Sequence, residues 1–302
     1  MKSKSLRGSL MLLLAAMVWG FAFVAQRVGM NSMQPLSFNA IRMLLAGVCL
    51  LPLLRRRKTG KSEVPAGRKD QLISGLLCGL FLFLASNLQQ AGLVSTDAGK
   101  SGFITALYVV LVPVMNYFFF RRNPGRWIWL SVTLAVAGLF LLCVPSAGTL
   151  SLNRGDLLTL GCALCFTGHI LVVDHFSPRV DPIRLSCHQF LISGFLALLF
   201  SLFSETITWT GIREALPSLL YAGIISGAVG YTLQIMGQEA TPPAMASLVM
   251  CLESVFAVLS GALILGERMS PREAWGCVMM FSAVVLAQLS PFLSTKMTAK
   301  TH

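Results

Sequence analysis

The chain has 302 residues, of which 55% are hydrophobic and only 12% are charged, and its formal net charge is +12. Soluble domains carry about 25% charged residues, so this composition excludes an ordinary water-soluble globule and makes the lipid bilayer the expected solvent. The basic residues stand in short clusters between apolar runs, not in a stripe beside aromatic residues. We therefore predict no nucleic-acid partner.

Ten apolar runs have about the 17–25 residues that a helix needs to cross a bilayer. In chain order they cover residues 9–29, 37–54, 71–91, 101–120, 127–144, 157–173, 185–203, 215–236, 244–265 and 272–289. The predicted fold is an all-α integral membrane protein with ten transmembrane helices.

The lysine and arginine residues predict the orientation of these spans. With the N-terminus in the cytoplasm, most of the 24 basic residues fall on the cytoplasmic side, which is the distribution that membrane insertion favours. An even number of spans then returns the C-terminus to the same side. We expect a multi-pass protein of the cell membrane, of the bacterial inner-membrane type, with both termini cytoplasmic.

The two halves of the chain resemble each other. The segment that begins at Gln89 aligns without gaps with the one that begins at Gln234, and this register places Tyr108 opposite Glu253. The segment from Pro35 likewise resembles the segment from residue 182. Five spans is an odd number, so the second copy has to enter the membrane upside down, an arrangement common in transporters.

We accordingly expect two inverted five-helix repeats, over residues 1–145 and 153–290, followed by a cytoplasmic tail at 291–302. G-x-x-x-G motifs recur near the start of spans three and eight, at Gly75 and Gly79 and again at Gly223 and Gly227. Such motifs let helices approach closely. They fit packing within one chain and between chains equally well, so the oligomeric state stays open.

Glu253 lies in the middle of the ninth apolar run, where a carboxylate is costly and has to face protein or water. It is a candidate for proton coupling, or for a counter-charge to a cationic substrate, or it is a structural group bonded to a neighbouring helix. Arg42, inside the second run, is its possible partner because a buried arginine also needs pairing. Alternatively, Arg42 extends toward a membrane interface.

Other polar and aromatic residues fall inside the spans and predict a substrate cavity. Asn87 and Gln90 are three residues apart, as are Tyr231 and Gln234, so each pair shares a helix face. The alternative is hydrogen bonding between helices without a substrate. The predicted lining consists of Trp19, Asn87, Gln90, Tyr108, His169, Tyr231 and Gln234, with Glu253 and Arg42 as coupling or structural charges.

A metal site is the other interpretation of His169, because Cys162, Cys165 and this histidine lie near one helical face. The motif stands alone, lacks a fourth ligand and has apolar surroundings, whereas zinc C-x-x-C sites come in pairs on loops. We therefore predict no metal and no cofactor.

The ninth and tenth runs, SLVMCLESVFAVLSGALILGERMS and AWGCVMMFSAVVLAQ, resemble the end of EamA-type members of the drug/metabolite transporter superfamily. WGFAFVAQR in span one and SGFITALYVVLVPVMNYFFFRR in span four fit the first half of that family. The resemblance implies ten helices in two inverted repeats and transport of small metabolites such as amino acids. Ser254 stands where the family often has proline, so the resemblance does not by itself predict a kink there.

These observations favour a secondary transporter that exports an amino acid or related small metabolite by alternating access, and not an enzyme. No Walker loop or hydrolase motif is present in the sequence, so the expected energy source is an ion or substrate gradient. One alternative is a membrane-embedded enzyme or lipid-handling protein. Another is a purely structural or receptor-like membrane protein.

Overall fold

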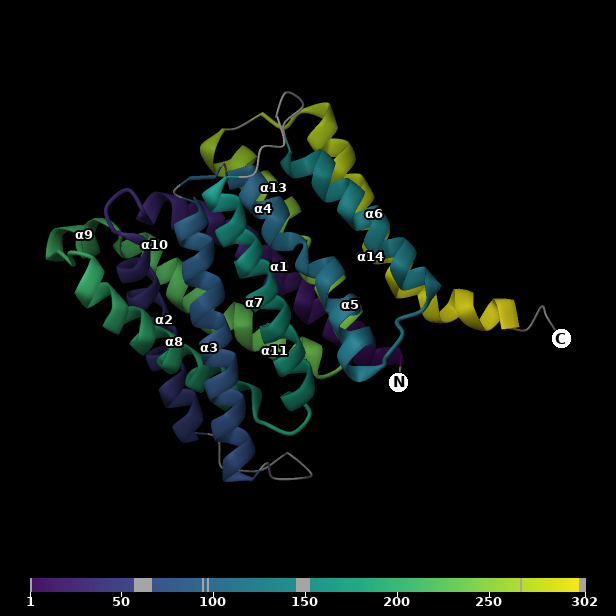
Figure 1. The fold of residues 1–302 in the computed structure, drawn as a ribbon, viewed down its shortest axis with the longest axis horizontal. Coiled ribbons are helices and arrows are strands. Elements are labelled where there is room, and N and C mark those ends of the chain that lie inside the picture. Colours follow the sequence, from purple (N-terminus) through teal and green to yellow (C-terminus); the bar gives the residue numbers. More distant parts are fainter. Residues whose placement is uncertain are drawn as a thin grey trace.

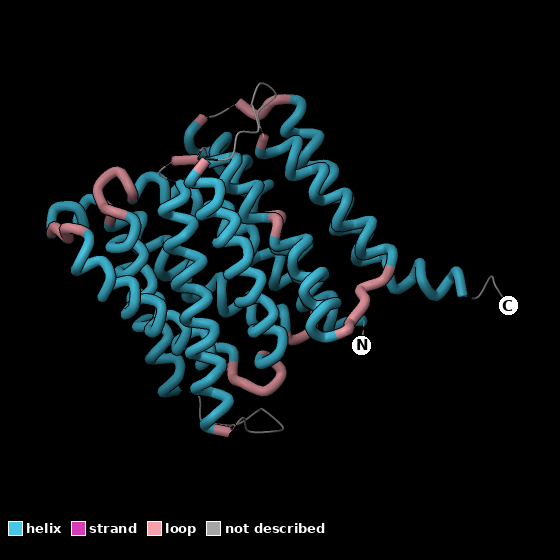
Figure 2. Tube along the Cα trace, viewed as in Figure 1, coloured by secondary structure: helices cyan, strands magenta, loops and turns pink. Residues whose placement is uncertain are grey.

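The computed structural model describes residues 2–56, 67–93, 95–96, 98–144, 153–266 and 268–298. All regular structure within these residues is helical, and the described connections are short (Figure 2). Ten helical stretches among them are long and apolar enough to cross a membrane. The predicted all-α membrane fold is confirmed.

Figure 1 shows the helices as one tilted bundle, in which α1 begins and α14 ends on the same face. We call this the terminal face, and the face where α1 ends the distal face. The first half contains α1 (Lys2–Gly29), α2 (Pro35–Arg56), α3 (Arg68–Leu93), α4 (Ala98–Ala106), α5 (Tyr108–Phe120) and α6 (Arg126–Cys143). The second half contains α7 (Arg154–Phe176), α8 (Pro182–Ser204), α9 (Trp209–Glu214), α10 (Leu216–Leu220), η1 (Tyr221–Tyr231), α11 (Thr232–Gln238), α12 (Pro243–Met250), α13 (Glu253–Leu265) and α14 (Pro271–Thr298).

The two halves pack with reciprocal contacts, as the inverted repeat requires. At the crossing of α2 and α8, a Cβ added to Gly47 would lie 2.7 Å from Leu191 Cδ2, and one added to Gly194 would lie 2.8 Å from Leu44 Cγ. Gly47 thus contacts Leu191, which lies three residues before Gly194, and Gly194 contacts Leu44, which lies three residues before Gly47. A two-fold axis in the membrane plane generates such an exchange. The fold is therefore two inverted five-helix repeats.

The same exchange recurs where α1 meets α11 and where α7 meets α3. A Cβ on Gly8 would lie 2.8 Å from the carbonyl oxygen of Gly237, and one on Gly155 would lie 2.6 Å from that of Gly92. Gly92 and Gly237 are aligned in the repeat register. Small residues at both crossings let the backbones approach closely.

The two G-x-x-x-G motifs also pack within the chain. A Cβ on Gly75 would lie 2.7 Å from His188 Cβ on α8, and a Cβ on Gly223 would lie 2.9 Å from the carbonyl oxygen of Arg42 on α2. The glycines of these motifs therefore allow close packing between helices of the two repeats.

Spans four and nine, which the sequence predicts as continuous helices, are each interrupted in the middle by a short turn whose residues keep right-handed helical dihedral angles. Helix α4 stops before Leu107 and α5 starts at Tyr108, while α12 stops before Cys251 and α13 starts at Glu253. At both breaks the backbone hydrogen bonds change from the α-helical pattern to the i→i+3 pattern of a 3₁₀ turn. The amide of Leu107 donates to the carbonyl oxygen of Ile104, and the amide of Leu252 donates to that of Val249, each at 3.2 Å. The breaks occupy equivalent positions in the two repeats.

Span eight also departs from the single helix that the sequence predicts. Its central part, η1, is a π-helix of 11 residues. It contains Gly223, Gly227 and Gly230, and the indole Nε1 of Trp19 donates a 3.2 Å hydrogen bond to the carbonyl oxygen of Ser226 within it. π-helical turns frequently mark functional sites.

The crossing of α2 and α8 provides a test of this packing. We expect Gly194→Ala to lower the melting temperature, because the new Cβ would lie 2.8 Å from the backbone nitrogen of Leu44 and overpacking costs about 1–3 kcal/mol. Gly161→Ala on α7 is the matched control, since its Cβ would meet only Leu88 Cδ1, at 3.5 Å. Thermal unfolding of both variants in detergent measures the difference. Equal melting temperatures would contradict the proposed tight crossing.

Candidate functional site

A cavity lies at the centre of the bundle, between helices of both repeats. Six of the residues singled out in the sequence line it, and they come from six different segments: Trp19, Arg42, Tyr108, Tyr231, Gln234 and Glu253. The helix breaks of spans four and nine deliver Tyr108 and Glu253 to it, because each is the first residue after its break.

Repeat-related pairs of side chains line this cavity. Trp19 and Phe166 occupy matching positions on α1 and α7, and both line it. The same holds for Gln89 and Gln234, and for Tyr108 and Glu253. The cavity therefore lies on the pseudo-two-fold axis that relates the repeats, where transporters of this architecture bind substrates.

Glu253 is held by the residue that the repeat register places opposite it. The Tyr108 hydroxyl donates a 3.1 Å hydrogen bond to Glu253 Oε1. This hydrogen bond gives the carboxylate a polar partner in the middle of the span.

Arg42 occupies neither of the positions that the sequence suggests. It does not extend to an interface, since it is buried with 7% of its surface exposed, and no ion pair joins it to Glu253 among the described residues. Its Nε instead donates a 2.7 Å hydrogen bond to Asn39 Oδ1. Asn39 in turn donates to the carbonyl oxygen of Ser86 at 3.2 Å and to Asn87 Oδ1 at 3.0 Å.

Asn87, Gln90 and His169 form a layer behind the cavity wall. Asn87 Oδ1 accepts the hydrogen bond from Asn39, and Gln90 Nε2 donates a 3.1 Å hydrogen bond to Gln26 Oε1. His169 Nε2 lies 2.8 Å from Gln189 Oε1, and its ring meets the edge of Tyr231 at a centroid distance of 6.0 Å. Their predicted role in substrate binding stays a prediction, and the structure gives them contacts that orient lining residues.

Two glutamines that line the cavity are missing from the sequence prediction, namely Gln26 and Gln89. The alignment of Gln89 with Gln234 is a signal that identifies Gln89, since repeat-related residues share a depth. Gln26 has no such signal, because it lies near the distal end of α1, where a polar residue fits an interface equally well.

Tyr231 forms an aromatic wall with its neighbours. Its ring lies 4.8 Å from that of Trp19 and 5.3 Å from that of Phe190, measured between centroids. Together with His169, these rings surround Tyr231 and fix its orientation. Aromatic pairs at such distances are stabilising by about 0.5–1.5 kcal/mol beyond their burial.

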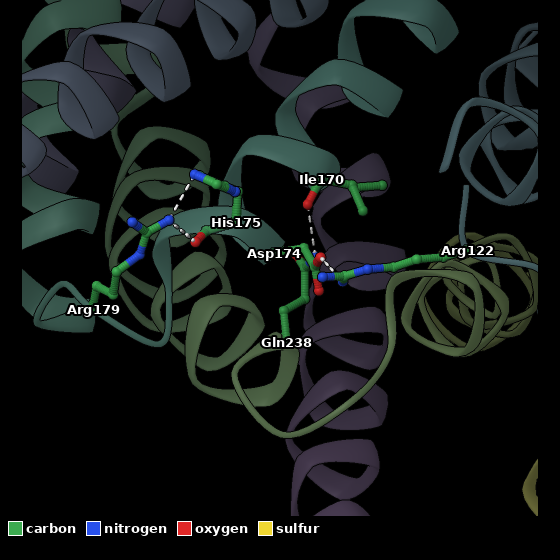
Figure 3. A network of polar contacts seen from close by, with 6 residues as sticks. All are labelled: Arg122, Ile170, Asp174, His175, Arg179 and Gln238. Carbon is green, nitrogen blue, oxygen red and sulfur yellow. Dashed lines mark hydrogen bonds and ion pairs between the residues drawn. The ribbon is translucent and has the colours of Figure 1, made fainter. Parts of the chain in front are cut away.

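Polar contacts lie on the side of the cavity toward the terminal face, and Figure 3 shows those of Gln238 with Ile170 and of Arg122 with Asp174. Gln234 Nε2 donates to Gln238 Oε1 at 3.0 Å, and Gln238 Nε2 donates to the carbonyl oxygen of Ile170 at 3.0 Å. Closer to the surface, Arg122 Nη1 lies 3.8 Å from Asp174 Oδ2. Exposed ion pairs contribute only about 0–1 kcal/mol, so the pair of Arg122 and Asp174 can separate at small cost.

The terminal half of the bundle is closed, and the distal half is less so. Helix α12, the terminal half of span nine, packs against α1, α5, α6, α7, α11 and α14. Its counterpart α4 packs closely against α3, α6, α7 and α13, and α1 is not among its close neighbours in the described part of the chain. Ser247 and Leu248 on α12 are fully buried, whereas their counterparts Gly102 and Phe103 are half-buried.

Ten helices among the described residues that are long and apolar enough to cross a membrane, inverted repeats, two interrupted helices and a central cavity are together typical of a membrane transport protein. The sequence matches the EamA-like transporter family over residues 6–144 and 153–289. The chain belongs to the EamA-like transporter family.

Several named relatives agree with this assignment. An uncharacterized transporter from Archaeoglobus fulgidus is 30% identical over 286 residues, covering 95% of this chain and 87% of that protein. The uncharacterized inner membrane transporter YedA of Escherichia coli is 28% identical over 299 residues, covering 91% and 89%. A solved crystal structure with 16% identity has the same fold, with a TM-score of 0.76 over 93% of this chain and 96% of that one.

Proposed function

We propose that this protein is a secondary transporter that exports a small organic metabolite, an amino acid or a related compound, by alternating access. The observation that carries the proposal is the asymmetry around the central cavity: α12 is enclosed on the terminal side, while its repeat-related counterpart α4 is less enclosed on the distal side. In an inverted-repeat transporter the two halves exchange such conformations.

In the proposed cycle the two repeats change roles. Helix α4 moves against α1 and α13 and closes the distal side. Helix α12 separates from α5 and α7, and the contact between Gln238 and Ile170 breaks. The substrate then faces the terminal side while Tyr108 and Glu253 stay at the centre. Glu253 is the proposed coupling group, because it is the carboxylate among the described lining residues.

The distribution of basic residues supports placing the terminal face in the cytoplasm of a bacterial-type inner membrane, with residues 291–302 as a cytoplasmic tail. Helix α14 extends into this tail as far as Thr298, and residues 299–302 lie outside the described part. Residues 1–145 and 153–290 are the proposed exchanging units. The proposed partners are the substrate and the bilayer, with neither nucleic acid nor a catalytic reaction involved.

Transport by the purified protein in sealed proteoliposomes tests this function. We expect saturable movement of one or more amino acids or related metabolites, and a change in accumulation when a pH gradient is imposed. Liposomes without protein are the control for leakage. Saturable movement without a response to the gradient would contradict proton coupling, and the absence of movement across the whole panel would contradict transport of this substrate class.

A further inference from the structure

Resting on the proposed transport function, we propose that Arg42 binds the carboxylate of the substrate, and that the rest of the substrate is a compact aromatic or apolar group packed against Trp19 and Tyr231. The substrate class is thus an aromatic or apolar carboxylate, with or without an amino group.

Arg42 is a buried cation that lines the cavity, and no carboxylate in the described part of the chain forms an ion pair with it. It is 7% exposed, lines the cavity and bonds through Nε to the neutral amide of Asn39. Among the described residues no group accepts a hydrogen bond from Nη1 or Nη2, and the lining carboxylate, Glu253, bonds to Tyr108 instead. An arginine stays charged in proteins, and a buried charge without a counter-ion is unfavourable. A bound anion removes that cost.

The hydrogen bonds around Arg42 leave its outer edge free and fix its position. Asn39 donates to the carbonyl oxygen of Ser86 and to Asn87 Oδ1, so both of its amide hydrogens are used and its Oδ1 is directed at Arg42. Asn87 is fixed in turn by a 2.7 Å hydrogen bond to the carbonyl oxygen of Phe83. The two Nη groups then present the paired donors that match a carboxylate.

The aromatic side chains around Tyr231 determine which chemical group the rest of the substrate can carry. Trp19 is held by its hydrogen bond to the carbonyl oxygen of Ser226, and Tyr231 is surrounded by Trp19, Phe190 and His169. Phe23 and Phe166 also line the cavity. Fixed ring faces favour an apolar or aromatic group over a highly hydrated one.

The position of Arg42 also breaks the symmetry between the repeats. Its counterpart in the second repeat is Gln189, which is fully buried and lies beside His169 instead of in the cavity. One cation on one side of the cavity gives the substrate one preferred orientation, with its carboxylate toward α2. A symmetric cavity would not distinguish its two ends.

Binding of four related probes to the full chain in nanodiscs tests the proposal. L-phenylalanine and 3-phenylpropionate carry the carboxylate, whereas L-phenylalaninamide and 3-phenylpropionamide carry an uncharged amide in its place. We expect each acid to bind at least about tenfold more tightly than the probe in which an uncharged amide replaces its carboxylate. The reason is that a hydrogen bond to a charged group contributes about 1.5–3 kcal/mol. Isothermal titration calorimetry measures the four affinities.

Arg42→Gln should abolish this difference, and Arg42→Lys should preserve part of it because the charge remains. Arg213→Gln, an exposed arginine on α9, is the matched control and should bind all four probes as the unmodified protein does. Equal affinity for acid and amide in the unmodified protein would overturn the proposal, even if Arg42→Gln does not fold. Carboxylate preference that survives Arg42→Gln, or binding of none of the four probes, would overturn it as well.

The same proteins in proteoliposomes separate this proposal from the transport function. Arg42-dependent binding of the carboxylates without any flux would support the binding site and count against transport. Flux of some other solute, unaffected by Arg42→Gln, would support transport and overturn the carboxylate site.

Discussion

Replacing Glu253 with glutamine is expected to reduce substrate accumulation driven by a pH gradient at least about tenfold. Glutamine has nearly the same size and still accepts a hydrogen bond from Tyr108, which lies 3.1 Å from Glu253 Oε1, but it cannot bind and release a proton. The loss should therefore affect coupling and leave the fold intact. A group of this kind in the middle of a span is expected to have a function.

The measurement compares two modes of transport in the same proteoliposomes. Accumulation against a gradient needs the proton cycle, whereas exchange of labelled for unlabelled substrate does not. Glu253→Gln should lose the first and retain much of the second. Glu214→Gln, an exposed carboxylate on α9, is the control and should retain both. If accumulation by Glu253→Gln equals that of the unmodified protein, Glu253 is a structural residue.

The sequence predicts the number of helices and the inverted repeat because both depend on hydropathy, length and the number of spans. It does not predict the breaks at Leu107 and at Cys251. A break replaces one backbone hydrogen-bond pattern by another and leaves the run equally apolar. Hydropathy therefore cannot predict it. Residue 254 is serine and not proline, so the sequence gives no signal for the second break, although the structure contains it.

The candidate site is only partly predictable for a related reason. Polar residues within spans have to face inward, so the sequence identifies Tyr108, Gln234 and Glu253 as interior groups, and all three line the cavity. It cannot distinguish the cavity wall from the layer behind it. Neighbouring residues such as Gln89 and Gln90 differ by about 100° around a helix, and the contacts of Gln90 with Gln26 become visible only when the helices are packed.

Enlarging Gly102 is expected to slow the transport cycle while leaving the fold stable. A Cβ on Gly102 would meet no atom within 4 Å, so an added side chain starts in open space in the conformation in which the distal side is open. Its repeat-related counterpart Ser247 is fully buried in the closed terminal half. When the halves exchange conformations, Gly102 enters that enclosed environment. Leucine there would overpack the closed distal side by about 1–3 kcal/mol.

Gly102→Leu should therefore slow turnover roughly tenfold, since about 1.4 kcal/mol shifts an equilibrium tenfold, with an unchanged melting temperature. Ser247→Leu should lower the melting temperature instead, because it overpacks a site that is already closed. Labelling of a single cysteine at Gln89, with native cysteines replaced, reports the distal opening and should stay high in Gly102→Leu whether or not substrate is present. Normal turnover by Gly102→Leu would show that α4 does not close as α12 does, and the exchange of conformations between the repeats would have to be abandoned.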